Sequence, residues 1–217
     1  MNFFSLFKRK KIFSLKKKIS IDTDKFEFNS LDDLFYHYGS DKSDKFKYNN
    51  HSGHGFSQFY EKHLSFKKAD EIKILELGSY AGASAVSFAK YFSKSKVFCF
   101  DINISNFKYY SKNIHVYGLD IKNKKKVEKE TNLIFDKFKI NNFDLIIDDG
   151  SHNLSDMLLS LRFFFKYLSS GGYYVIEDYK FPNYYKRNND LNHIYIDSLL
   201  EKIIKKEFFE SSIMEKG

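Results

Sequence analysis

Five short apolar runs recur at regular intervals in the C-terminal two thirds of the chain, and each closes on a glycine or an acid. They are KILELG (73–78), KVFCFD (96–101), NIHVYGLD (113–120), FDLIIDDG (143–150) and GGYYVIED (171–178). Segments with the spacing of amphipathic helices lie between them, at 84–92 and 154–168. Strands that are apolar on both faces and alternate with helices are typical of a mostly parallel sheet covered on both sides. The pattern predicts a doubly wound, Rossmann-like α/β fold.

The C-terminal segment adds two more candidate strands. EKIIKKEFF (201–209) and SSIMEKG (211–217) read as strands joined by a short turn. We therefore expect a seven-stranded sheet that carries an antiparallel hairpin at one edge. No repeat or proline-rich linker divides the chain, so we expect a basic tail at 1–20, a helical extension or lid at 21–70 and one α/β domain at 71–217.

Composition excludes two classes of protein. Hydrophobic residues make up 42% of the chain and aromatic residues 19%, which is too much for a disordered polymer. No apolar run approaches the roughly 18 residues that a membrane span requires. The single cysteine, Cys99, excludes an intramolecular disulfide and a thiolate metal cluster, so we expect a reducing compartment such as the cytoplasm.

The net charge of +8 is concentrated in the N-terminal tail. Residues 1–18 contain seven Lys and Arg and no acid, so the remaining chain carries a net charge of only +1. A nearly neutral body gives no reason to expect a nucleic-acid partner. The tail also contains Phe, Leu and Ile between its cations, and two interpretations stay open. It is either a frayed or packed arm, or a short helix that lies on an anionic membrane, which would place the protein at the inner face.

The turn after the first apolar run has the features of a ligand-binding loop. Glycines at 78 and 82 allow close approach of the backbone, and a helix begins directly after them. Glu76 in the preceding strand would repel a pyrophosphate and suits an amino-bearing ligand. Asp101, after the second run, can accept both hydroxyls of a ribose.

A second group of acids follows the fourth and fifth runs. Asp149, Glu177 and Asp178 end what should be neighbouring strands, and three carboxylates in one pocket require a cation. Oxygen ligands without cysteine favour Mg²⁺ or a similar ion. His152 follows Asp149 by three residues and is placed to act as a base. Together these groups could ionise a weakly acidic hydroxyl.

In this order, these motifs resemble the class I S-adenosylmethionine (SAM)-dependent methyltransferases, and among them the metal-dependent sugar O-methyltransferases. The upstream segments YGSDK (38–42) and HGFSQFYE (54–61) also resemble that family, so the resemblance covers roughly residues 35–217. The chain departs from the family pattern at Ala83, where a second glycine is usual, and at Leu119, which interrupts the family's usual Gly-Asp pair.

The resemblance implies SAM and Mg²⁺ as cofactors and assigns roles to individual residues. It implies metal ligands at Asp149, Glu177 and Asp178, with His152 as the catalytic base. We expect acceptor contacts from the loops at 38–60 and 179–187, with Asp41, Lys42, His54, Tyr60 and Tyr179 as candidate lid or substrate residues. For His54 and the YGSDK loop a purely structural role stays open. The implied cofactor contacts are Glu76, Gly78, Ser79, Tyr80, Gly82, Ser84, Asp101, Ile102, Asp120 and Asp148.

The sequence thus predicts an O-methyltransferase that acts on a hydroxyl of a surface glycan or of a sugar-nucleotide precursor. Two alternatives stay open: an enzyme for a small aromatic, catechol-like hydroxyl, and a catalytically silent SAM-binding subunit. The mutually repelling acids argue against the silent subunit. The sequence does not decide between a monomer and a homo-oligomer.

Overall fold

A computed structural model describes residues 3–49, 51–179 and 193–214. The chain divides into two compact units, residues 1–118 and 119–217. None of the described helices is both long and apolar enough to cross a bilayer.

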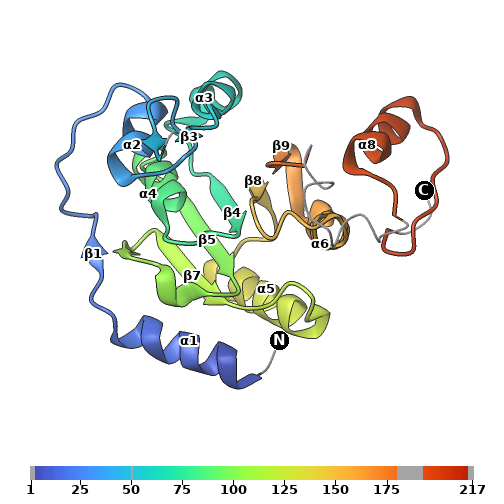
Figure 1. The fold of residues 1–217 in the computed structure, drawn as a ribbon, viewed down its shortest axis with the longest axis horizontal. Coiled ribbons are helices and arrows are strands. Elements are labelled where there is room, and N and C mark those ends of the chain that lie inside the picture. Colours follow the sequence, from blue (N-terminus) through green and yellow to red (C-terminus); the bar gives the residue numbers. More distant parts are fainter. Residues whose placement is uncertain (1–2, 50, 180–192, 215–217) are drawn as a thin grey trace. The chain divides into compact units, whose positions relative to one another are not determined.

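The first unit is built on three parallel strands in the order β7-β5-β4 (Figure 1). These strands are β4 (Lys73–Leu77), β5 (Lys96–Asp101) and β7 (Ile114–Gly118). Residues 97–100 are almost completely buried, as expected for a strand that is apolar on both faces. Helix α4 (Ala83–Tyr91) connects β4 to β5 and is buried along most of its length.

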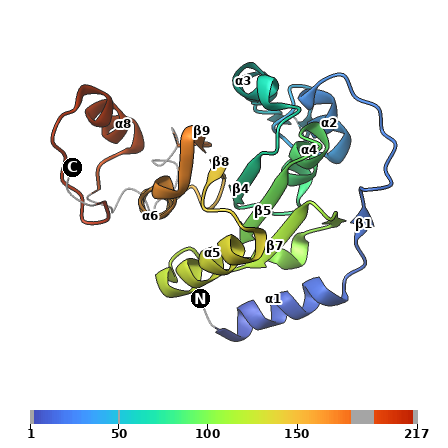
Figure 2. The ribbon, with the colours of Figure 1, turned by 180° about the vertical axis from the view of Figure 1, so that it is seen from behind.

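Three helices precede this sheet: α1 (Phe3–Leu15), α2 (Leu31–Tyr38) and α3 (Ser57–Leu64), which continues into η1 (Ser65–Lys67). The short strand β1 (Ile19–Ser20) pairs in parallel with β6 (Tyr109–Tyr110), and β2 (Lys47–Tyr48) pairs antiparallel with β3 (His51–Ser52). A 3-10 turn, η2 (Ile104–Asn106), follows β5. Figure 2 shows α2, α3 and α4 gathered at one end of this unit.

An aromatic cluster holds these three helices together. The rings of Phe35 on α2, Tyr60 on α3 and Phe88 on α4 contact one another edge to face, with centroids 5.0 to 6.4 Å apart. All three side chains are fully buried. Tyr60, predicted as a lid or substrate residue, therefore packs in the core of the first unit.

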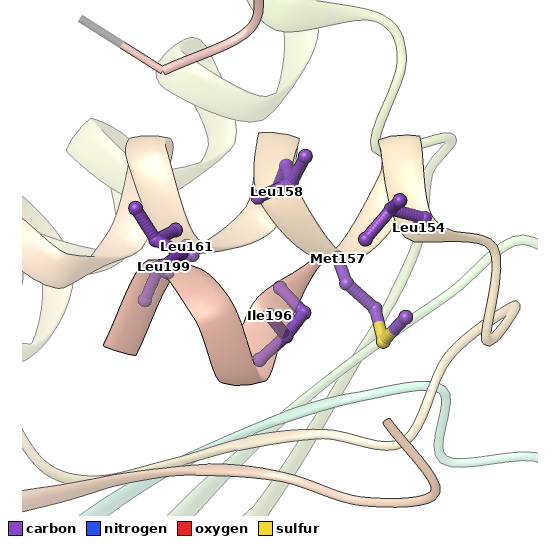
Figure 3. Close-up of a cluster of buried hydrophobic side chains, with 6 residues drawn as sticks. All are labelled: Leu154, Met157, Leu158, Leu161, Ile196 and Leu199. Atoms are coloured by element: carbon purple, nitrogen blue, oxygen red, sulfur yellow. The ribbon is translucent and has the colours of Figure 1, made fainter. Parts of the chain in front are cut away.

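The second unit contains two parallel strands, β8 (Phe143–Asp148) and β9 (Leu168–Ile176), with a register irregularity at the start of β8. Its helices are α5 (Lys124–Phe138), α6 (Leu154–Phe164) with η3 (Phe165–Tyr167), and α8 (Ile196–Lys205). Figure 3 shows the apolar cluster in which α6 and α8 pack together. Its members are Leu154, Met157, Leu158, Leu161, Ile196 and Leu199.

The five strands predicted from the apolar runs are confirmed, whereas the predicted edge hairpin is wrong. Residues 196–205 form α8, and no strand follows it among the described residues up to 214. The physical reason is visible in the spacing of Ile196, Leu199 and Ile203, which recur every three or four residues as on one helix face. The expected seven-stranded sheet is thus replaced, in the described residues, by three long parallel strands in one unit and two in the other.

Candidate cofactor and metal sites

The predicted glycine loop joins β4 to α4 in the first unit. Gly78, Tyr80 and Gly82 all have left-handed backbone, with φ of 90°, 42° and 86°. At Gly82 a side chain would also meet the ring of Phe107, whose nearest atom lies 2.5 Å from an ideal Cβ position. Gly82 therefore serves both the turn and the close packing of Phe107 beneath it. Gly82 caps α4 without a side-chain hydrogen bond, so the first N–H groups of this helix face the loop.

In this unit, two acids predicted to bind the cofactor lie beside the glycine loop. Glu76 is fully buried in β4 and accepts a hydrogen bond from the Ser84 hydroxyl at the start of α4. Asp101 ends β5, and its Oδ2 accepts the backbone N–H of Tyr80 at 2.7 Å. Its Oδ1 accepts the N–H of Asn103 at 2.5 Å. The Asp101 carboxylate thus ties the glycine loop to the end of β5.

Most predicted cofactor residues of the first unit therefore gather at the carboxyl ends of β4 and β5. Ser79 is buried and its hydroxyl donates to the backbone oxygen of Glu76 at 3.4 Å, while Tyr80 is 69% exposed at the loop tip. Ile102 is partly exposed, and its backbone oxygen accepts a hydrogen bond from Arg9 of α1. This edge of a parallel sheet is where α/β proteins bind ligands.

The upstream motifs form a closed loop structure. The N–H of His54 donates to the Asp41 oxygen at 2.7 Å, and the N–H of Phe56 donates to the Lys42 oxygen at 3.0 Å. Gly53 is required between them, because a Cβ there would lie 1.8 Å from the Ser43 oxygen. Asp41 and His54 are exposed, whereas Lys42 is almost completely buried. The two motifs are therefore brought together, and their predicted lid role stays a prediction.

In the second unit, Asp148 ends β8 in a buried position. Burial raises the pKa of this carboxyl to about 7, against the opposing effect of a hydrogen bond from Ser160. Its Oδ2 has no hydrogen-bond partner among the described residues. The Asp120 carboxylate stabilises the turn in which it lies, because it accepts the N–H of Lys122 at 3.0 Å. Both residues keep their predicted cofactor roles as predictions.

A candidate metal centre lies just beyond β8 and β9. Asp149, His152 and Asp178 each offer one ligand atom, and these atoms all lie within 4.8 Å of one another. Nε2 of His152 lies 3.7 Å from Oδ1 of Asp149. His152 and Asp178 both have left-handed backbone, with φ of 53° and 56°, and such strain persists where the surrounding structure holds a functional side chain in place.

The composition of this cluster differs from the predicted one in a single member. Glu177 was expected beside Asp149 and Asp178, but it is buried and lies outside the group, while His152 lies within it. The D-x-x-H spacing of Asp149 and His152 is the sequence signal for this arrangement. Tyr179 directly follows the cluster and is half-buried. Apart from Tyr179, the acceptor loop expected at 179–187 lies outside the described residues.

Support for the glycine loop from α1 was not foreseen from the sequence. The Phe13 ring contacts Phe107 edge to face at 6.5 Å between centroids, and Phe107 in turn packs on Gly82. The N–H of Lys108 donates to the Ala81 oxygen at 3.1 Å. Nothing in the spacing of these aromatic residues distinguishes them from ordinary core residues.

Comparisons with known proteins agree with this architecture. Residues 75–179 match the model of a family described as a methyltransferase domain. L-olivosyl-oleandolide 3-O-methyltransferase of Streptomyces antibioticus is 32% identical over 157 residues, which cover 68% of this chain and 36% of that protein. Demethylmacrocin O-methyltransferase of Streptomyces fradiae is 26% identical, over 58% of this chain and 32% of that protein. The chain thus spans about a third of the length of these curated relatives.

A solved structure shares the fold. MycE methyltransferase from the mycinamycin pathway, solved in complex with Mg, SAH and mycinamycin VI, has a TM-score of 0.66 and 20% identity. The match covers 87% of this chain and 55% of MycE. The resemblance to methyltransferases drawn from the sequence is therefore confirmed for residues 75–179, and the α/β fold class is confirmed with it.

Proposed function

We propose that this chain, with its methyltransferase domain at 75–179, transfers the methyl group of SAM to a hydroxyl of a sugar. The observation that carries the proposal is the Asp149, His152 and Asp178 cluster beyond two parallel strands, in a chain that also has a methyltransferase-type glycine loop. A named relative supports a sugar acceptor, because it is an L-olivosyl-oleandolide 3-O-methyltransferase.

The first unit supplies the groups that recognise SAM. The buried Glu76 carboxylate suits the ligand's amino group, and the carboxylate of Asp101 suits the ribose hydroxyls. The left-handed turns at Gly78 and Gly82 bring backbone N–H groups close to the ligand. Ser84 holds Glu76 by a hydrogen bond, which fixes the direction of that carboxylate.

The donor set in the second unit fits a divalent cation. Two half-buried carboxylates within 4.8 Å repel each other unless a positive charge neutralises them. Carboxylate oxygens suit Mg²⁺ or Mn²⁺. Asp149 and Asp178 would hold the ion. When bound, such an ion acts as a Lewis acid that lowers the pKa of an alcohol.

We assign the proton transfer to Nε2 of His152. The Asp149 carboxylate, 3.7 Å away, stabilises the imidazolium that forms when this nitrogen accepts the proton of the sugar hydroxyl. The left-handed backbone at His152 directs the ring toward the two acids. The ring therefore needs only the acceptor hydroxyl within hydrogen-bond reach to act as general base.

The test is a methyl-transfer assay with SAM on nucleotide sugars and surface glycans, run beside small catechols. We expect His152→Ala to lower the rate by about 10²- to 10⁴-fold, the usual contribution of a general base. SAH binding measured by calorimetry should stay unchanged in that variant. His63→Ala on α3 is the matched control and should keep full activity.

Three outcomes would change the assignment. Methylation of catechols alone would favour the aromatic acceptor. SAH binding without methyl transfer to any acceptor would favour a catalytically silent SAM-binding subunit. Full activity after treatment with a chelator would remove the metal from the proposal.

A further inference from the structure

Helix α1 is a packed element with an inner and an outer face. On the inner face, Nη1 of Arg9 donates to the Ile102 oxygen at 3.0 Å, and the Phe13 ring contacts Phe107. Nζ of Lys16 donates to the Ser105 oxygen at 3.2 Å. Figure 1 shows α1 lying beside β7 in the first unit. The helix is thus held in one orientation, so its two faces have different surroundings.

The outer face carries large apolar side chains that nothing in the described chain covers. Phe7 is 63% exposed, Ile12 42% and Leu15 77%. At 100° per residue these three side chains span about 140° of the helix circumference, on the side opposite Phe13. Ile19, in the short strand β1, is also 57% exposed. A fold gains nothing from exposing four such side chains, and contiguous apolar patches mark interaction sites.

Cations lie among these apolar side chains and next to them: Lys8 and Lys11 lie between them on the helix circumference, and Lys17 follows the end of α1. Lys8, Lys11 and Lys17 are exposed, and the part of the chain that the structure describes gives them no hydrogen bond or ion pair. Other cations of this segment make hydrogen bonds within the fold. For example, Nζ of Lys18 donates to the Phe13 oxygen at 2.7 Å at the end of the helix. No acid occurs in residues 1–18, so no charge on this segment neutralises the lysines.

We propose that the outer face of α1 docks on an anionic lipid surface. Phe7, Ile12 and Leu15 would enter the boundary between headgroups and acyl chains, while Lys8, Lys11 and Lys17 would lie among the lipid phosphates. A nucleic acid would satisfy the lysines but would leave the apolar side chains exposed to water. A second copy of the chain would cover the apolar side chains but would bring seven more cations against these seven.

The experiment is co-sedimentation of the full chain with vesicles of phosphatidylcholine that contain about 30 mol % phosphatidylglycerol, compared with phosphatidylcholine alone. We expect binding to the anionic vesicles only, and its loss at about 1 M salt, where screening is complete within ~3 Å. Replacing Lys8, Lys11 and Lys17 together by Gln should weaken partitioning about 100-fold, since each basic residue near the surface contributes about 1 kcal/mol.

A second variant distinguishes binding to a membrane from binding to a polyanion such as RNA. Phe7→Ser with Leu15→Ser keeps every charge and should weaken vesicle binding by at least about tenfold, because the lost term is apolar burial. Both positions are exposed, so circular dichroism and thermal unfolding should match the parent chain. The matched charge control replaces Lys125, Lys129 and Lys137 on α5 by Gln, where acids of the same helix lie between the lysines.

The proposal would be overturned by equal vesicle binding of the α1 and α5 lysine variants. It would also be overturned if Phe7→Ser with Leu15→Ser left vesicle binding intact. Binding of an RNA oligomer that exceeds vesicle binding and ignores the serine substitutions would assign the cations to nucleic acid. A sedimentation-velocity dimer abolished by those substitutions would assign the face to a second copy.

Discussion

Asp33 shows how one carboxylate can hold a helix start and a neighbouring loop together. Its Oδ2 accepts the N–H groups of Asn29 and Ser30 at 3.1 Å, and the Ser30 hydroxyl accepts the Asp33 N–H in return. Its Oδ1 accepts a hydrogen bond from Nζ of Lys45 at 2.6 Å. The bond from Lys45, followed by that from Asn29, lowers the pKa of Asp33 to about 2.

Because this pKa is lower in the folded chain than its usual value near 4, Asp33 stabilises the fold above pH 4 and loses that effect as the pH falls toward 2. We expect Asp33→Asn to lower the free energy of unfolding by about 1 kcal/mol at pH 7, as for a lost helix cap. Urea unfolding at pH 7 and near pH 2 measures the difference, which should vanish at the lower pH. Asp70→Asn, at an exposed turn, should change little at either pH.

Gly82 combines two constraints that can be separated by comparison with Gly39. Both have left-handed backbone, with φ of 86° and 78°, but only at Gly82 would a Cβ meet another group, the Phe107 ring at 2.5 Å. Each Ala substitution should cost about 1–2 kcal/mol of stability from the backbone alone. Only Gly82→Ala should also weaken SAH binding in calorimetry, by at least about tenfold, since Phe107 and the loop must shift. Equal SAH affinity in the two variants would contradict the role of Gly82 in the loop.

At the scale of elements, the packing of α6 against α8 gives the second unit much of its apolar core. Leu199 is fully buried between these helices (Figure 3). We expect Leu199→Ala to lower the free energy of unfolding by about 3 kcal/mol, because the substitution leaves a cavity. Urea unfolding measures this loss. Ile204→Ala on the same helix removes a side chain that is 79% exposed and should change stability by less than about 0.5 kcal/mol.

The same elements explain how far the sequence could predict the structure. The five long strands were predictable because each is a continuous apolar run between polar ends. Helix α8 was not, because the run Ile203-Ile204 between lysines fits a short strand and a helix equally well when read without Ile196 and Leu199. The order of α1 was also hidden, since four consecutive cations interrupt its apolar residues and its stability depends on contacts with Ile102 and Phe107.

The candidate site also has features that the sequence could predict and features that it could not. Acids that end strands were predictable from position alone, which applies to Asp101, Asp148 and Asp149. Side-chain direction was not, because Glu177 and Asp178 are adjacent and only the backbone conformation decides which of them joins Asp149. The left-handed φ of 56° at Asp178 turns that residue, and not Glu177, into the cluster.

At the scale of the whole molecule, charge and chemistry occupy different parts of the chain. Seven of the eight excess positive charges lie in residues 1–18, whereas the candidate metal centre is formed by residues 149–178. The near neutrality of the remaining chain suits a sugar acceptor better than a polyanionic one. Under the two proposals, the charge bears on membrane docking through α1 and little on the choice of acceptor.

The contact between Phe13 and Phe107 has a practical consequence for the choice of where to cut the chain. A basic N-terminal segment is commonly trimmed before biophysical work, and Ile21 would be a natural new start. Trimming there would remove the ring that backs Phe107, which itself packs on Gly82. Linkage between two sites is reciprocal, so a lipid surface that changed the affinity for SAM through α1 would have its own affinity changed by SAM by the same factor. A chain that began at Ile21 would therefore lose the proposed lipid-binding face and the support of the glycine loop together.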